Sequence, residues 1–315
     1  RVVRRGAVCH VTNRCYRGEL RLSPDDAVNG FAEGCLAKAA RRYGVRIIAF
    51  IVMGNHFHLI LQVPLFNLDA FMEFFQRELS RRLNLYRGVE GSNFPTRYSD
   101  EEIASAADFE QVVARVLCNP VRARLVGAVD QWPGTSSLQM HRSGVGRRVV
   151  LHASRDQAEE MGRRGMTPTL ERSMERTELA LSPPPFWDSW EPDEVQARIA
   201  ELVELEETRL QAEIERSNER VTGPSRIRRE SHDQRPDEVH WRSYRRVISR
   251  DPEYEAAYHR WYEAMRRDYW RSARRWRADG EWADYPPGTF PPGWLECLRP
   301  SRGVGPPLPW QRPML

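Results

Sequence analysis

Two histidines separated by one residue, His56 and His58, lie in the apolar stretch MGNHFHLIL at residues 53–61. Side chains alternate across a β-strand, so these two imidazoles share one face while Phe57 points to the other. Neutral imidazoles are common metal ligands, and a pair on one strand face forms half of a metal site. The alternative is two partly exposed histidines on the surface of a sheet.

The elements around this pair are two predicted strands joined by a tight turn. Residues 45–53 form a continuous apolar run rich in β-branched residues, and residues 59–63 form a second run of the same kind. Gly54 and Asn55 connect the two runs, which is a composition typical of a hairpin. The histidine pair therefore stands at the start of the second strand, and Asn55 is expected to serve the turn.

Further elements precede and follow the hairpin. A strand at residues 6–15 leads to a helix that ends at Gly44, and a second helix with an apolar stripe covers residues 67–88. A third helix is expected to start from an Asp108 cap and to stop at Pro120. This order predicts an α+β fold with helices on one face of an antiparallel sheet.

Composition narrows the class of protein. The chain has 315 residues, of which 40% are hydrophobic and 29% charged, which is typical of a globular protein with a sizeable core. No apolar run approaches the roughly 18 residues that cross a bilayer, so no membrane partner is expected. The cysteines are odd in number and show no C-x-x-C spacing, which argues against a disulfide framework and favours a reducing cytoplasm. They are Cys9, Cys15, Cys35, Cys118 and Cys297.

Arginine dominates the basic residues. The net charge is +4, and Lys38 is the single lysine among 48 basic residues, which leaves 48 − 1 = 47 arginines. Arginine gathers at residues 81–87, 119–124 and 266–277, as a nucleic-acid partner would require. A solvated helix face is the alternative for each cluster.

Four domain-level segments are expected along the chain. Residues 1–142 hold the α+β elements, and residues 143–190 form a linker or irregular region rich in Arg, Gly and Pro. Residues 191–285 carry two long helical patterns, and residues 286–315 form a Pro-rich tail.

Four ordered motifs in the first segment carry a family resemblance. They are HVTNR (residues 10–14), NHFHLIL (55–61), NPVRARLV (119–126) and WPGTSS (132–137). In this order they resemble the REP-associated branch of the single-tyrosine HUH transposases. The resemblance covers about residues 1–142 and implies a ferredoxin-like antiparallel sheet. It also implies DNA transposition, by cleavage and rejoining of single-stranded or hairpin DNA.

The same resemblance implies a site and a cofactor. In the family, the two histidines and an amide residue bind a divalent cation, and His56, His58 and Asn119 match those positions. Mixed imidazole and oxygen ligation suits Mg²⁺ or Mn²⁺ better than a closed zinc site. A bound cation would stabilise the charge that accumulates on a phosphodiester under attack. Members that transpose often act as dimers, so a homodimer is a further expectation.

The nucleophile is the main departure from the family pattern. The family's tyrosine stands four residues before the amide, where this sequence has Arg115, and a guanidinium cannot attack a phosphate. Three interpretations stay open. Another tyrosine, Tyr98 first and Tyr86 second, serves as nucleophile; the protein binds DNA without cutting it, as a domesticated transposase; or water attacks, which makes the protein a nuclease.

Four arginines are candidate DNA contacts, because guanidinium forks match phosphate oxygens. A solvated surface position is the alternative for each. They are Arg14, Arg115, Arg122 and Arg124.

Overall fold

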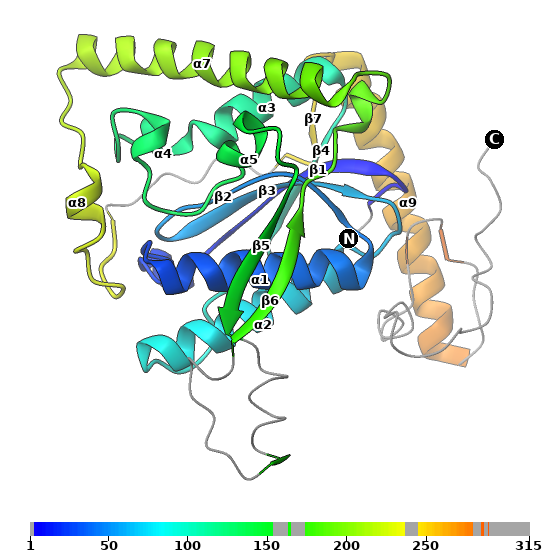
Figure 1. The fold of residues 1–315 in the computed structure, drawn as a ribbon. Helices are drawn as coiled ribbons and strands as arrows, with labels where there is room; N and C mark the ends of the chain where they lie inside the picture. The colour runs from blue at the N-terminus through cyan, green and yellow to red at the C-terminus, as the bar shows by residue number, and fades with distance from the viewer. Residues whose placement is uncertain are drawn as a thin grey trace.

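A five-stranded sheet with the strand order β2-β3-β1-β4-β7 forms the centre of the molecule (Figure 1). The first four of these strands pair antiparallel, and β7 adds to the edge parallel to β4. The strands are β1 (Ala7–Arg14), β2 (Arg46–Val52), β3 (His56–Val63), β4 (Ser99–Ile103) and β7 (Val247–Ile248). The computed structural model describes residues 3–153, 163–164, 174–236, 245–279, 285–286 and 289.

Two helices cover one face of the sheet, and their connections give the fold its topology. Helix α1 (Asp26–Tyr43) joins β1 to β2, and α2 (Leu68–Arg87) joins β3 to β4. Glycine in the left-handed region ends both helices, with φ of 65° at Gly44 and 64° at Gly88. The order β1-α1-β2-β3-α2-β4 is ferredoxin-like, so the predicted α+β class and topology are confirmed.

The second face of the sheet is also covered by helices, in addition to the face that α1 and α2 cover. Helix α3 packs against α7, and apolar residues of both join Ile48 and Ile60 of the sheet in a second core (Figure 1). The helices on this side are α3 (Ala106–Leu117), α4 (Asn119–Arg122), α5 (Leu138–Arg142) and α7 (Pro192–Ser217). The expected Asp108 cap is corrected, since the Ser105 side chain caps α3 by accepting from the Asp108 N–H.

Alternation along β3 places the two histidines on the second face. Phe57, Leu59 and Leu61 join the core beneath α1 and α2, whereas Ile60 joins the core beneath α3. His56 and His58 have the same parity as Ile60, so they face α3. Because the apolar residues of β3 are fully buried, a one-residue slip would move the histidines into the α1/α2 core, and this fixes their register.

The C-terminal part packs on the sheet domain and contains more than helices. The segment expected to be an irregular linker contains a hairpin of β5 (Arg147–Ala153) and β6 (Met174–Ala180), which packs on α1. Helix α9 (Pro252–Asp279) follows β7 and buries Tyr258, Tyr262 and Met265 with Val247. Four shorter elements are η1 (Tyr16–Gly18), η2 (Val129–Gln131), η3 (Pro185–Trp187) and α8 (Pro224–Ile227). Most of the expected tail at residues 286–315 lies outside the described residues.

Two findings bear on the class of protein. Among the described residues, no helix combines the length and apolar character that a membrane span needs. Four cysteines within that part of the chain are buried thiols without a disulfide, namely Cys9, Cys15, Cys35 and Cys118.

A histidine outside the candidate site makes stability depend on pH. Burial lowers the pKa of His141 in α5 to about 4, and its buried Nε2 has no hydrogen-bond partner among the described residues. In the unfolded chain this group titrates near ~6.5, so the unfolded state binds more protons between the two values. Stability from this residue is therefore complete above the unfolded pKa and is lost as pH falls towards about 4.

The variant His141→Gln tests this expectation. Urea unfolding at about pH 7 and about pH 4.5 should show that the wild-type protein loses more unfolding free energy than the variant, by on the order of 2 kcal/mol. Equal losses in the two proteins would show that His141 does not titrate differently in the folded and unfolded states.

Candidate functional site

Three histidines lie side by side on the face of the sheet that α3 covers. The ring of His10 of β1 lies nearly parallel to that of His58, with ring centroids 5.2 Å apart and an interplanar angle of 8°. His56 meets His58 edge to face, with centroids 4.9 Å apart. His58 is therefore the middle ring of the row, with His10 of the neighbouring strand β1 on one side and His56 of its own strand β3 on the other.

A chain of hydrogen bonds runs through the middle of this row. Asn119 Nδ2 lies 3.0 Å from His58 Nε2, His58 Nδ1 lies 3.0 Å from His10 Nε2, and His10 Nδ1 lies 3.2 Å from Glu101 Oε2. An amide N–H only donates, so His58 Nε2 accepts, His58 Nδ1–H donates to His10, and His10 Nδ1–H donates to Glu101. Glu101 thus fixes both tautomers and leaves the His58 Nε2 lone pair directed at Asn119.

Asn55 holds the remaining histidine. Its Oδ1 lies 2.7 Å from His56 Nδ1, and its Nδ2 donates to the Gly18 carbonyl oxygen at 3.1 Å. Asn55 is buried and has no positive φ, so its role is to orient His56 rather than to permit the turn, which corrects the expectation for this residue. With Nδ1–H donating to Asn55, neutral His56 carries its lone pair on Nε2.

The environment keeps all three histidines neutral. Burial lowers the pKa of His56 to about 4, and the positive charge of Arg14 adds to this effect. Burial lowers the pKa of His58 well below its ordinary value, and charges at His56, His10 and Arg115 lower it further. Burial also lowers the pKa of His10, which Glu101 offsets in part. At neutral pH the Nε2 atoms of His56 and His58 therefore carry lone pairs rather than protons.

Asn119 and Arg115 reach the histidines from the end of α3. Helix α3 closes at Cys118, and Asn119 begins the single turn of α4 with Pro120 behind it. Asn119 contacts His58 directly, and the Arg115 guanidinium is close enough to lower the pKa of both His10 and His58. The positions matched to the family's amide and tyrosine thus face the histidine row, with a cation where the tyrosine is expected.

Arg14 also lies at this face. It pairs in register with His56 across β1 and β3, and paired residues of an antiparallel ladder point the same way. The structure therefore brings together five of the predicted site residues. They are Arg14, His56, His58, Arg115 and Asn119.

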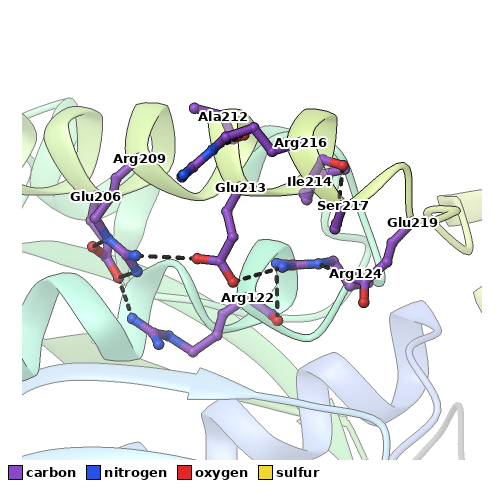
Figure 2. A network of polar contacts seen from close by, with 10 residues as sticks. All are labelled: Arg122, Arg124, Glu206, Arg209, Ala212, Glu213, Ile214, Arg216, Ser217 and Glu219. Atoms are coloured by element: carbon purple, nitrogen blue, oxygen red, sulfur yellow. Dashed lines mark hydrogen bonds and ion pairs between the residues drawn. The ribbon is translucent and has the colours of Figure 1, made fainter.

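Arg122 and Arg124, the other two expected DNA contacts, do not extend towards the histidines. Figure 2 shows both guanidinium groups turned towards the acidic edge of α7. Arg122 pairs with Glu206, while Arg124 contacts Glu213 at 2.9 Å and Glu219 at 2.7 Å. In this state their charge is neutralised within the protein.

Tyr98, the expected substitute nucleophile, lies on the opposite face of the sheet. It is 5% exposed in the core beneath α1 and α2, and its hydroxyl donates to Asp69 of α2. The second candidate, Tyr86, also belongs to α2. Strand parity explains the error, because Tyr98 precedes β4 on the side of Asp100 and Glu102, whereas Glu101 faces His10.

The residue types at this face are ones that divalent cations accept as ligands. Adjacent ligands of an octahedral ion lie about 3 Å apart when each bond is about 2.1 Å, and His58 Nε2 and the Asn119 amide are 3.0 Å apart. Turning the amide over presents Oδ1 in place of Nδ2 without moving the side chain. Two imidazole nitrogens with one amide oxygen suit Mn²⁺ better than Mg²⁺, which prefers an all-oxygen set. Within the described residues, no three His, Cys, Asp or Glu side chains form a cluster able to hold a metal, so the histidine row alone does not make a metal site.

Sequence reasoning missed Glu101 and the ligand-orienting role of Asn55. The acidic stretch SDEEI at residues 99–103 gave no signal, because its function arises only when β4 pairs with β1. For His10, within the HVTNR motif, two interpretations were open: a residue at the face of His56 and His58, or a structural histidine of the strand. It proves to be both, since it lies at that face and uses both ring nitrogens.

Comparisons with known proteins add little to this geometry. No protein-family model and no curated protein sequence matches the chain. A solved structure of a REP-associated tyrosine transposase bound to a REP hairpin is similar over 45% of this chain and 83% of that one, with 22% identity and a TM-score of 0.38. A likeness this weak supports no conclusion about activity, so the function must be argued from the residues of the site.

Proposed function

We propose that this protein binds single-stranded or hairpin DNA at the histidine face, where a divalent cation and Arg115 share one backbone phosphate. The cation is held by His56, His58 and Asn119. The observation that carries the proposal is the convergence of neutral imidazoles, an amide and a guanidinium from three separate parts of the chain. A guanidinium fork matches two phosphate oxygens, and a strand without a partner can bring its backbone against a sheet face.

The chain's own residues divide the work at such a site. Arg115 binds phosphate oxygens, and Glu101 acts through His10 to keep the His58 lone pair aimed at the ligand position. Asn55 does the same for His56. The cation, when bound, neutralises charge on the phosphate.

Charge balance couples the cation to the DNA. The three proposed ligands are neutral and Arg115 is positive, so the cation meets no anionic ligand until a phosphate arrives. Mn²⁺ should therefore bind more tightly when DNA is present, and DNA more tightly when Mn²⁺ is present, by the same factor.

Hydrolysis is a second candidate function, favoured by the oriented Glu101–His10–His58 chain, which is more than phosphate binding requires. Arg115 cannot act as nucleophile and Tyr98 is buried on the other face, and in this candidate function water attacks the phosphate. In that step water oxygen bonds to phosphorus, the bond to the leaving oxygen breaks, and the leaving oxygen takes up a proton.

Binding and cleavage of a labelled DNA hairpin test both functions. Fluorescence anisotropy should show binding that Mn²⁺ strengthens, that weakens steeply with salt, and that exceeds binding to blunt duplex of the same sequence. Cleavage in ¹⁸O-water should place ¹⁸O in the new phosphate if water attacks, whereas intact DNA leaves binding as the function. A covalent tyrosine adduct would contradict the hydrolytic step, and no binding would overturn the proposal.

Arg115→Gln should weaken hairpin binding by about tenfold and reduce its coupling to salt, because one charge-assisted phosphate contact is lost. The same anisotropy titration measures both effects. Arg147→Gln is the matched control, since Arg147 is an exposed arginine of β5, outside the arginine clusters, whose ion pair is with Glu178. Equal affinities for the two variants would show that Arg115 does not contact the DNA.

A further inference from the structure

A band of alternating charge joins α4 to α7, and we name it the α4–α7 seam. Arg209 lies between its two halves and contacts Glu206 at 2.8 Å and Glu213 at 3.2 Å (Figure 2). The seam holds three arginines and three glutamates and so carries no net charge. Its members are Arg122, Arg124, Glu206, Arg209, Glu213 and Glu219.

The seam begins where the candidate site ends. Arg122 belongs to the same helical turn as Asn119, and the Ala123 N–H closes that turn by donating to the Asn119 carbonyl oxygen. A DNA strand with one phosphate beside His58 and Asn119 would therefore pass over α4 next. Its following phosphates would meet arginines that are already paired.

These ion pairs are of the exchangeable kind. Each pair has one side chain that is open to water, since Arg122 is 38% exposed beside Glu206 at 15%, and Glu213 is 45% exposed beside Arg124 at 19%. Partly exposed ion pairs contribute modestly to stability, so a phosphate can take the place of a carboxylate. A hydrogen bond from Arg209 lowers the pKa of Glu206, and one from Arg124 lowers that of Glu213, so both groups are carboxylates at neutral pH.

The carboxylates are not what attaches α7. Its apolar side buries Ile199, Val203 and Leu210 against α3 and its surroundings. The Arg198–Glu110 pair and the Glu207 contact to the Val129 N–H add further attachments away from the seam. Glu206 and Glu213 can therefore release their arginines while the helix stays in place.

We propose that the α4–α7 seam is a second DNA-contact surface, in which backbone phosphates take the place of Glu206 and Glu213 as partners of Arg122 and Arg124. The inference rests on the proposed function, because it extends the same strand from the histidine face. In the free protein the glutamates occupy the arginines and oppose non-specific attraction of polyanions. When DNA binds, the exchange adds two phosphate contacts.

Two charge-matched double variants test this inference. Glu206→Gln with Glu213→Gln removes the α7 carboxylates that pair with Arg122 and Arg124, while Glu219 still pairs with Arg124. Glu204→Gln with Glu215→Gln removes the same charge from exposed carboxylates of α7 that make no ion pair among the described residues. Both variants gain equally from long-range attraction, so their difference measures the seam alone. Hairpin affinity of the seam variant should exceed that of the control by about fivefold at low salt.

Adding Arg122→Gln and Arg124→Gln to the seam variant should remove that difference. It should also reduce the slope of log affinity against log salt by about 1.4, which is about 0.7 for each lost contact to a single strand. Thermal unfolding of all variants confirms that α7 stays attached. Equal affinity of the seam variant and its control would overturn the inference while leaving the proposed function intact. Absence of DNA binding by the wild-type protein would overturn both.

Discussion

His58→Ala is expected to lower the affinity for Mn²⁺ in the presence of hairpin DNA by more than about 100-fold. Loss of a residue that hydrogen-bonds to a metal ligand typically lowers metal affinity 10- to 100-fold, and removal of the ligand itself should lower it further. His58 is the ring that contacts Asn119 on one side and His10 on the other, so its loss also breaks the hydrogen-bond chain. Isothermal titration of Mn²⁺ into the protein–DNA complex measures the effect.

His259→Ala is the matched control for this variant. His259 lies on α9 with its side chain 45% exposed, and its removal takes away one imidazole without touching the sheet. The control should bind Mn²⁺ as the wild-type protein does. If both variants lose the same affinity, the metal is not held at the histidine face.

Glu101→Gln is expected to have the second largest effect, a loss of Mn²⁺ affinity of about 10- to 100-fold. The amide keeps a hydrogen-bond acceptor for His10 Nδ1–H but loses the negative charge that holds the proton there. The amide can also present its N–H instead, which would reverse the tautomers of His10 and His58 and turn the His58 lone pair away from the ligand position.

Two measurements separate this positioning role from a merely structural one. Nitrogen-15 NMR of the imidazoles should show His58 with its proton on Nδ1 in the wild-type protein and a mixture of tautomers in Glu101→Gln. Glu73→Gln removes the same charge from the exposed surface of α2, on the other side of the sheet, and should change neither the tautomer nor Mn²⁺ binding. An unchanged tautomer in Glu101→Gln would contradict the role of Glu101.

Local patterns in the sequence foretold the framework of the site. The alternation His56, Phe57, His58 specified which side chains share a face, because burial of the apolar set fixes the register of β3. The placement of Asn119 beside His58 was also anticipated, although that expectation came from the family resemblance rather than from spacing alone. Both features depend on residues close in sequence or on a known motif.

Contacts between distant segments could not be foretold in this way. The face of the sheet on which Tyr98 lies could not be predicted, because a segment of irregular sequence precedes β4. That face depends on the residue at which β4 begins to pair with β1. The ion pairs of Arg122 and Arg124 could not be foreseen, because their acidic partners on α7 stand more than 80 residues later in the sequence. The β5–β6 pair was missed because its two strands are far apart in the sequence, whereas a hairpin is predicted from two strands that a short turn joins.

Pulsed electron paramagnetic resonance of Mn²⁺ bound to the protein–hairpin complex tests the central claim most directly. The account predicts magnetic coupling from the metal to two imidazole nitrogens and to a DNA phosphorus, with one nitrogen coupling lost in His58→Ala. A spectrum with phosphorus coupling but no imidazole nitrogen, together with unchanged DNA binding after chelation of the metal, would contradict it. The histidine row would then be a structural feature of the sheet rather than a metal site.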